Sequence, residues 1–338
     1  GSGKSMTLTS VLNSMPNFML APLNFSSGTT PELILKTFQQ YCEYRSGRDG
    51  MTLSPSAPGK WLIIFCDEIN LPENDSYGTQ RVITFLRQLT EKKGFWKEET
   101  NEWVTIQRIQ FVGACNPPTD PGRVVMSNRW LRHAPILFVD FPSPTSLNQI
   151  YGTFSRGLLK LQPSLRSYSD SLTDAMVEMY VEKRTRFKPT AQPHYIYSPR
   201  ELSRWVRALY KAMKEMADMK LEDLVRVWLH EGLRLFLDRL TTAEEQMWCS
   251  ETADKIALKN FVGADPDCIK RPILFSNWLS KQYQEVEPQA LRQHVEARLR
   301  TFYEEELDVE LVVFDEVLDH VLRIDRVLRQ PLGHLLLV

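Results

Sequence analysis

The sequence has few cysteines, and their arrangement does not suggest a disulfide framework or a metal module. Among its 338 residues there are five cysteines, an odd number, with no CxxC pair and no Cys/His cluster at the spacing of a zinc site. This pattern excludes a small secreted domain held together by disulfides and favours buried free thiols in a reducing compartment. The five are Cys42, Cys66, Cys115, Cys249 and Cys268.

The chain also lacks long apolar runs and an excess of charge of either sign. No apolar run approaches the roughly 20 residues that a helix needs to cross a bilayer, and no signal peptide is visible. The formal net charge is −1 with both signs interspersed, so the basic patch typical of nucleic-acid binding is missing. We therefore expect a soluble intracellular protein with no membrane and no nucleic-acid partner. Its length suggests two or three domains.

One apolar stretch that is present ends in two acids. The sequence WLIIFCDEIN, residues 61–70, runs from Trp61 into the adjacent pair Asp67 and Glu68. A short continuous apolar run predicts a strand buried on both faces of a parallel sheet. In open α/β sheets, ligands bind just beyond the carboxyl ends of the strands. The pair is therefore a candidate ligand site, although an acidic turn after a strand is the simpler alternative.

The first residues of the chain favour the ligand site. Gly1-Ser2-Gly3-Lys4-Ser5 matches the last five positions of the phosphate loop G-x-x-x-x-G-K-[ST]. In such loops backbone N–H groups surround the phosphates, the lysine reaches the outer phosphates and the hydroxyl binds Mg²⁺. The helix expected from Met6 onward would point its N-terminus at the anion. A short GSGKS alone could come from a linker, but together with the acid-ended strand it indicates a P-loop NTPase.

Up to about residue 142 the pattern alternates between strands and helices, which predicts an α/β domain with a parallel sheet and helices on both faces. The strand that precedes Asn116 should lie beside the acidic strand, so Asn116 could orient a water or contact the outer phosphate. A simple turn is the alternative for this asparagine. The expected elements are strands at Phe18–Phe25, Ile109–Cys115 and Ile136–Phe141, helices at Pro31–Tyr44 and Gly78–Glu91, a loop over residues 46–60 and a hairpin from Gly94 to Val104.

Beyond residue 142 the pattern is helical. Ser198, Pro199 and Glu201 form a helix start signal, and Arg200 places a cation at that N-terminus, against the helix dipole. Either an anionic ligand or an ion pair with Glu201 or Glu231 would explain Arg200. The expected helices are Leu147–Lys160, Leu172–Phe187, Pro199–Met216, Leu221–Leu240 and Phe314–Arg329, and a final strand is expected at His334–Val338.

Four segments along the chain closely resemble one known family. WLIIFCDEINLP, QFVGACNPPTDPGR, HYIYSPREL and DHVLRIDRVLRQ are similar to the third AAA+ module of cytoplasmic dynein heavy chains. The resemblance implies an AAA+ core over residues 1–142 that lacks its first strand and the opening of the phosphate loop. It further implies an α-helical lid over residues 143–260, and then a helical linker with the first strand of the next module over residues 261–338.

The resemblance also implies roles for individual residues. Lys4 and Ser5 resemble the phosphate-loop lysine and the magnesium-binding hydroxyl, Asp67 the acid near Mg²⁺, and Glu68 the base that aligns water. Asn116 resembles the first sensor and Arg200, next to Pro199, the second sensor. Arg129 or Arg132 would be the arginine finger for the neighbouring module's nucleotide. The nucleotide-binding set is Gly1, Ser2, Gly3, Lys4, Ser5, Met6, Asp67, Pro199 and Arg200.

By the same resemblance the chain is an ATPase module that binds ATP or ADP with Mg²⁺ and regulates a minus-end-directed microtubule motor in the cytoplasm and cytoskeleton. The implied partners are neighbouring AAA+ modules, a second heavy chain and dynein accessory chains. The microtubule would be reached through a stalk outside this sequence. Two alternatives stay open: a structural module that holds nucleotide without turnover, and a non-dynein AAA+ ATPase such as a MoxR-type chaperone.

Overall fold

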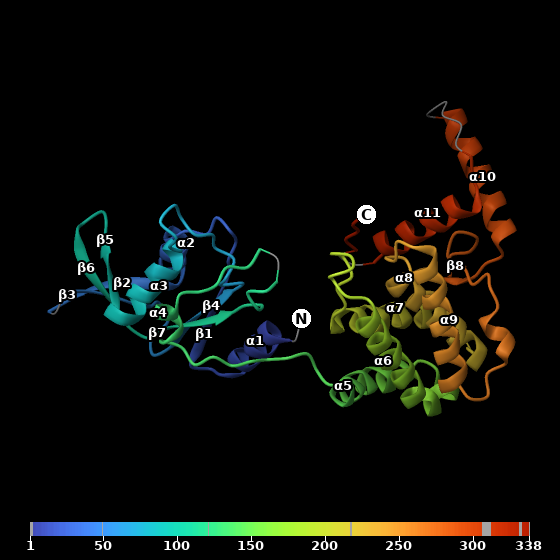
Figure 1. Cartoon of the computed structure of the whole chain (residues 1–338), viewed down its shortest axis with the longest axis horizontal. Coiled ribbons are helices and arrows are strands. Elements are labelled where there is room, and N and C mark those ends of the chain that lie inside the picture. Colours follow the sequence, from blue (N-terminus) through green and yellow to red (C-terminus); the bar gives the residue numbers. More distant parts are fainter. Residues whose placement is uncertain are drawn as a thin grey trace. The chain divides into compact units, whose positions relative to one another are not determined.

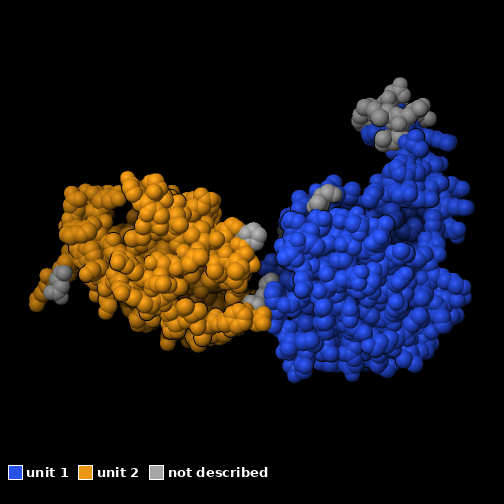
Figure 2. All heavy atoms as spheres, viewed as in Figure 1, with its two compact units in different colours: residues 1, 141–338 blue, residues 2–140 orange. Residues whose placement is uncertain are grey.

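A computed structural model shows that the chain divides into two units, residues 2–140 and residues 141–338 (Figure 2). Each unit has its own hydrophobic core and is described by itself. The residues that the structure describes are 3–48, 50–120, 122–216, 218–305, 312–330 and 333–337.

A three-stranded parallel sheet is the centre of the N-terminal unit (Figure 1). Strand β4 (Trp61–Asp67) lies between β1 (Phe18–Asn24) and β7 (Ile109–Ala114). Residues 62–66 of β4 are buried, which confirms the predicted central strand. The strands β1 and β7 are also confirmed, but β7 is an edge strand with only Ala114 buried, whereas the sequence predicted a buried strand.

Four helices accompany this sheet. Apolar residues of α2, α3 and α4, with those of β1 and β4, form one core that includes Ile34, Phe38, Ile64, Val82 and Leu86, whereas α1 has no buried residue. Helix α3 begins three residues later than predicted because Gly78 takes a left-handed φ of 75°, which a helix cannot include. The helices are α1 (Lys4–Ser14), α2 (Pro31–Tyr41), α3 (Arg81–Lys92) and α4 (Asn128–Leu131).

The prediction of a helix to Tyr44 followed by a loop over residues 46–60 is wrong. Strands β2 (Cys42–Gly47) and β3 (Gly50–Pro55) form an antiparallel hairpin there. Strand β3 pairs in parallel with β6 (Glu102–Ile106), which pairs with β5 (Gly94–Lys97) in the predicted hairpin. The resulting four-stranded sheet lies at the opposite end of this unit from α1 (Figure 1). Pairing with the distant strand β6 decides this structure, and local propensity does not reveal it.

Two predicted strands are absent from the described part of the chain. Residues 136–141 have no regular structure, and Ile136, Leu137 and Phe138 are 73%, 83% and 84% exposed. A strand needs a neighbour that accepts its backbone hydrogen bonds, and no described strand pairs with this segment. The end of the chain likewise has no strand over residues 333–337, and the last residue of the predicted strand, Val338, lies outside the described residues.

The C-terminal unit is mainly helical, as the sequence predicts (Figure 1). Helix α7 begins with the predicted capping box, in which the Ser198 N–H donates to Glu201 Oε2 at 2.8 Å. The helices are α5 (Pro144–Leu158), α6 (Ser169–Arg186), α7 (Pro199–Glu215), α8 (Leu221–Phe236), α9 (Ala243–Asn260), α10 (Pro288–Glu305) and α11 (Asp315–Leu328). Short elements join them: the 3₁₀ helices η1 (Pro163–Tyr168) and η2 (Pro266–Ile269), and the strands β8 (Phe275–Ser276) and β9 (Gln284–Glu285).

Helices α7 and α8 pack closely against each other in this core. Trp205 on α7 and Trp228 on α8 are each 1% exposed, with ring centroids 5.0 Å apart. Gly232 lets the Trp205 ring approach the α8 backbone, because a Cβ at Gly232 would lie 2.4 Å from a carbon of that ring. The glycine in the middle of α8 is therefore required by packing.

Helix α11 is attached to the same core by a buried charge. Arg326 lies 2.6 Å from Glu231 of α8, whose side chain is 2% exposed, and stacks 4.0 Å from the centroid of the Tyr283 ring. The Tyr283 hydroxyl donates to the same carboxylate oxygen at 3.0 Å. Because a buried carboxylate without partners is costly, removing Arg326 would destabilise the unit.

Three further predictions from composition can be compared with the described residues. All five cysteines are unpaired, and every one except the half-buried Cys115 is buried. None of the described helices combines the length and the apolar character needed to cross a membrane. No cluster of His, Cys, Asp and Glu side chains suited to a metal ion occurs in the same part of the chain.

We expect Gly232→Ala to lower the free energy of unfolding of the C-terminal unit by about 1–3 kcal/mol, because the added methyl group overpacks the contact with Trp205. Chemical denaturation measures the change. Gly157→Ala on α5 is the matched control, since a Cβ there meets no atom within 4 Å. The control should be neutral or stabilising, and equal destabilisation by the two variants would contradict the packing role of Gly232.

We also expect the stability of this unit to depend on the protonation of His230. Burial lowers the pKa of this histidine from 6.5 to about 4, and its Nδ1 lies 3.1 Å from the Ile273 carbonyl oxygen. Between these pH values the unfolded chain binds the proton more readily, so stability is present above pH 6.5 and is lost as pH falls toward 4. The loss should be on the order of 3 kcal/mol. Denaturation at several pH values measures this dependence. His230→Gln should make the free energy of unfolding depend less on pH, and an unchanged pH dependence would contradict the role of His230.

Candidate functional site

The end of β4 carries the two acids that the sequence singles out. Asp67 is the last residue of the strand, paired in register with Asn24 of β1 and Ala114 of β7. Glu68 follows with a left-handed φ of 58°, an uncommon backbone conformation for a residue other than glycine. Its N–H donates to Asp67 Oδ1 at 3.2 Å, and its carbonyl oxygen accepts from Leu71 N at 2.9 Å. Local hydrogen bonds therefore hold the Glu68 backbone and one oxygen of the Asp67 carboxylate.

The start of α1 meets this edge of the sheet. Ser5 Oγ donates to Asp67 Oδ2 at 3.1 Å, and Lys4 Nζ donates to Asn116 Oδ1 at 3.2 Å. The serine is 62 residues from its partner in sequence, and the lysine is 112 residues from Asn116. The structure thus brings together Lys4, Ser5, Asp67 and Asn116, four residues that the sequence predicts for one site.

The geometry of these residues fits a magnesium nucleotide. Gly3 caps α1 with a left-handed φ of 85°, and no side chain caps the helix. The first helical bond runs from Thr7 N to Gly3 O at 2.9 Å, so the N–H groups before it have no partner among the described residues. Such N–H groups bind phosphate, and the adjacent Ser5 hydroxyl and Asp67 carboxylate are oxygen ligands of the kind that Mg²⁺ takes.

Three predicted nucleotide contacts can be placed only in part. Gly1 and Ser2 lie outside the described residues. Met6 lies on α1 with 75% of its surface exposed, so its side chain packs little against the unit. Its backbone N–H, at the start of α1, is the part that a phosphate could contact.

Sequence reasoning missed two residues that complete the site. Asn70, 2% exposed, donates from Nδ2 to the Asn116 carbonyl oxygen at 2.8 Å and accepts at its own carbonyl from Val124 N at 2.9 Å. Arg123 Nη2 lies 2.6 Å from Glu68 Oε2. Only their positions in the sequence could have pointed to these two residues. Asn70 follows the acid pair closely, and Arg123 ends the proline-rich loop after Asn116.

The thiol of Cys115 lies within the electrostatic field of these charges. Burial raises its pKa, and Glu68 raises it further, while the cations Lys4 and Arg123 lower it. The charges of Lys4, Glu68 and Arg123 therefore all influence the pKa of this one thiol. A thiol with a raised pKa is mostly protonated at neutral pH and is a poor nucleophile. The Cys115 thiol is therefore not activated as a nucleophile.

The two arginine-finger candidates differ in their surroundings. Arg132 Nη2 donates to Glu91 Oε1 at 2.6 Å, and His133 Nε2 lies 2.9 Å from the same oxygen. Hydrogen bonds from Arg132 and His133 lower the pKa of Glu91 and keep it charged. Arg129 is exposed on α4, and its side chain has no polar partner among the described residues.

Pro199 and Arg200 belong to the C-terminal unit, at the start of α7. The side chain of Arg200 is exposed, and the suggested ion pairs with Glu201 or Glu231 are not formed. Glu201 lies 3.6 Å from both Arg204 and Arg239, and Glu231 pairs with Arg326. Arg200 is therefore free, within the described part of the chain, to meet another anion.

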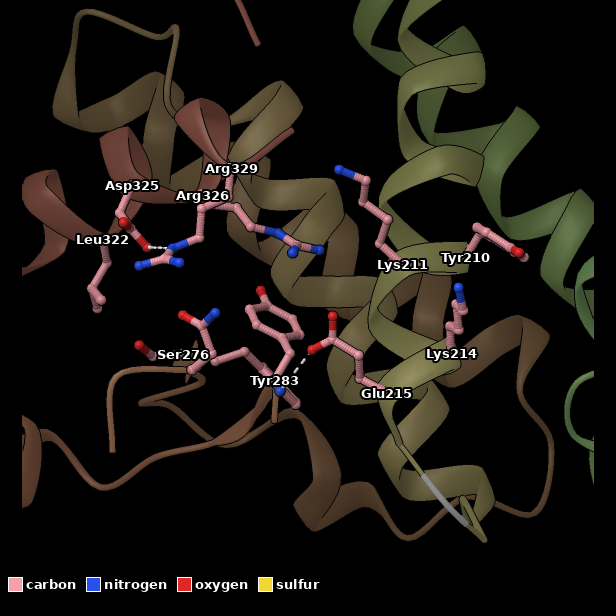
Figure 3. A pocket seen from close by; sticks show the side chains of 12 residues that line it. Tyr210, Lys211, Lys214, Glu215, Ser276, Tyr283, Leu322, Asp325, Arg326 and Arg329 are labelled. Carbon is pink, nitrogen blue, oxygen red and sulfur yellow. Dashed lines mark hydrogen bonds and ion pairs between the residues drawn. The ribbon is translucent and has the colours of Figure 1, made fainter. Parts of the chain in front are cut away.

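A second polar pocket, of about 310 Å³, lies within the C-terminal unit (Figure 3). Figure 3 shows Lys211 and Lys214 of α7 on one side and Arg326 of α11 with Arg329, the residue after this helix, on the other, with Tyr283 between them. Both arginines already have acidic partners, Glu231 and Asp325. None of the predicted site residues lines this pocket, so it is not the site that the sequence indicates.

Comparison with known families agrees with the division into two units. Residues 1–142 match the family model "P-loop containing dynein motor region", and residues 154–246 match "Dynein heavy chain, ATPase lid domain". The two matches together span more than half of the chain, and both are dynein families. The alternative of a non-dynein ATPase such as a MoxR-type chaperone is therefore wrong.

Curated relatives match the whole chain. It is 62% identical to the cytoplasmic dynein heavy chain of Dictyostelium discoideum, 59% to that of Drosophila melanogaster and 54% to that of Caenorhabditis elegans. Each match covers 100% of this chain and 7% of the relative, so the chain spans a small part of the length of these proteins. With an α/β P-loop unit followed by a helical unit that contains an ATPase lid domain, the chain belongs to the dynein heavy chain family.

Proposed function

We propose that this chain is an ATP-binding and hydrolysing AAA+ module of a dynein heavy chain, a regulatory site and not the one that delivers the stroke. The observation that carries the proposal is the meeting of Lys4 with Asn116 and of Ser5 with Asp67 at one edge of the sheet. These four residues match the parts that P-loop NTPases use to bind a magnesium nucleotide.

The described residues divide the work as follows. The start of α1 and Lys4 would bind the phosphates, and Ser5 and Asp67 would hold the metal or its waters. When bound, Mg²⁺ neutralises charge on the phosphates. Glu68 orients the attacking water and accepts its proton, while Asn116 contacts the outer phosphate. Catalysis of this kind depends on positioning and on charge stabilisation.

Two arginines would act beyond this cluster. Arg200, exposed at the start of α7, would reach the phosphates from the lid as the second sensor. Arg129 fits the trans finger for the preceding module better than Arg132, because Glu91 already neutralises Arg132. A finger contributes about 10³–10⁵ in rate, and the one for this site would come from the next module. The chain alone should therefore turn over ATP slowly.

The place of this module in a larger motor is part of the same proposal. We assign residues 1–142 to the nucleotide-binding subdomain, 143–260 to the lid and 261–338 to a linker that leads into the next module. The chain would be the third of six AAA+ modules in a ring. Its partners would be the neighbouring modules, a second heavy chain and accessory chains, with the microtubule contacted elsewhere, in the cytoplasm.

A second candidate is a module that holds nucleotide without turning it over. The ion pair between Glu68 and Arg123 favours it, because the guanidinium takes an acceptor position of the carboxylate that would otherwise be available to water. The presence of Glu68 itself favours catalysis, since a purely structural site does not need it.

We expect Lys4→Ala to weaken the binding of both MgATP and MgADP to the purified 338-residue chain by about 10–100-fold. The reason is that a charge-assisted contact to phosphate is lost. Isothermal titration calorimetry measures the affinities. Lys36→Ala, an exposed lysine on α2, is the control and should bind as the wild type does. Equal affinities for all three proteins would contradict the assignment of this phosphate site.

In the intact heavy chain, Glu68→Gln should lower ATP turnover at this site by about 10² or more, because the residue that activates water is lost. Motility should change with it if the site regulates the motor. Steady-state turnover and microtubule gliding are measured together. Glu73→Gln, an exposed acid in the loop after the site, is the control. Unchanged motility would favour the structural, nucleotide-holding module.

A further inference from the structure

A cation from another part of the N-terminal unit engages the carboxylate of Glu68. Arg123 Nη2 lies 2.6 Å from Glu68 Oε2, and the two side chains are 15% and 34% exposed. This pair is less solvated than a surface ion pair, so its attraction is less screened. The acceptor position that faces the guanidinium is not available to a water molecule, and the attraction to Arg123 restricts the orientation of the whole carboxylate.

The position of Glu68 is fixed by its surroundings. Its left-handed φ of 58° is held by the hydrogen bonds to Asp67 Oδ1 and from Leu71 N. Residues in such sparsely populated conformations persist where the surrounding structure determines them, often at functional sites. The partner of the carboxylate can therefore change more readily than the position of its backbone.

Arg123 has N–H donors beyond the one that faces Glu68. A guanidinium carries five N–H donors in a planar fork that matches carboxylate or phosphate. Arg123 Nε is buried and has no hydrogen-bond partner among the described residues, and the ion pair with Glu68 is made through Nη2. A buried donor without an acceptor is costly, so a ligand that offers further oxygens would be favoured here.

The loop that carries Arg123 is tied to the residue that would contact the outer phosphate. The Asn70 side chain donates from Nδ2 to the Asn116 carbonyl oxygen, and its backbone carbonyl oxygen accepts from Val124 N. Asn116 and the residue after Arg123 are therefore both bonded to the buried residue Asn70. Lys4 belongs to the same site, because its Nζ donates to Asn116 Oδ1. The charges of Lys4, Glu68 and Arg123 also all influence the pKa of the Cys115 thiol.

We propose that Arg123 is a triphosphate sensor that exchanges partners: it holds Glu68 until an outer phosphate binds, and then contacts that phosphate and releases Glu68 to the attacking water. The inference rests on the proposed function. The phosphate supplies the anion that Arg123 gains when it leaves Glu68, so the guanidinium is never left without a countercharge. A diphosphate lacks that group and leaves the pair intact.

An experiment can distinguish the exchange of partners from a permanent ion pair between Arg123 and Glu68. If Arg123 only neutralises Glu68, its effect on triphosphate binding vanishes once Glu68 is replaced by a neutral residue. If Arg123 contacts the outer phosphate, its effect persists in the Glu68→Gln background, where the two side chains no longer form an ion pair. Glu68→Gln also slows hydrolysis, so triphosphate affinity can be measured at equilibrium.

The test is calorimetric titration of MgATP and MgADP into the 338-residue chain carrying Glu68→Gln, with and without Arg123→Gln. We expect the added substitution to lower MgATP affinity about tenfold, because one charge-assisted contact is lost, and to leave MgADP affinity within about twofold. Arg45→Gln in the same background is the matched control, since Arg45 lies on β2 and forms an ion pair with Glu43. The control should alter neither affinity.

Other outcomes overturn the exchange. An unchanged MgATP affinity would show that Arg123 acts only through Glu68, and an equal loss for both nucleotides would show a general effect on the site. In both cases the proposed function stands. If the wild type and Lys4→Ala bind neither nucleotide, the proposed function fails and the exchange fails with it.

A second variant guards against a loss of fold. If thermal unfolding shows that Arg123→Gln does not fold, Arg123→Lys keeps the charge but not the planar fork. In the Glu68→Gln background this variant should lose about threefold in MgATP affinity with MgADP unchanged. Equal MgATP affinities for lysine and arginine at this position would then overturn the exchange.

Discussion

The parallel pairing of β4 with β1 and β7 is the constraint on which the site depends. Its register places Asp67 at the strand end beside Ala114, so that Asn116 follows at the same edge of the sheet. Parallel strands must return through long connections, and here those connections carry α2, α3 and the second sheet. Residues far apart in sequence thereby meet within hydrogen-bond distance, as Lys4 and Asn116 do. If the register of β7 slipped by one residue, Asn116 would be displaced from Lys4.

The charges at this edge balance one another. Lys4 and Arg123 supply two cations, and Asp67 and Glu68 supply two carboxylates, with each cation contacting a polar group of the same site. A magnesium nucleotide would bring a metal ion to the carboxylates and phosphate oxygens to the cations. The contacts within the site are incomplete, because Arg123 Nε and Asn70 Oδ1 are buried and have no hydrogen-bond partner among the described residues.

Sequence reasoning predicted the chemistry of the site better than its surroundings. Lys4, Ser5, Asp67 and Asn116 were predictable because a phosphate loop and polar residues at strand ends are local patterns. The hairpin at Cys42–Pro55 was not, because it depends on the pairing of β3 with the distant strand β6. Residues 136–141 have the composition of a strand, yet no described strand pairs with them. Arg123 could not be matched with Glu68, since an ion pair across a loop leaves no periodicity in the sequence.

The most direct measurement is the structure of this chain with Mg²⁺ and a non-hydrolysable ATP analogue. The outer phosphate should accept from Lys4 Nζ and from the Nδ2 amide group of Asn116, and the present 3.2 Å contact between Lys4 Nζ and Asn116 Oδ1 should be broken. The metal should lie beside Ser5 and Asp67. A phosphate bound elsewhere, for example among Lys211, Lys214 and Arg329 of the C-terminal unit, or an unchanged contact between Lys4 and Asn116, would contradict the assignment of the nucleotide site.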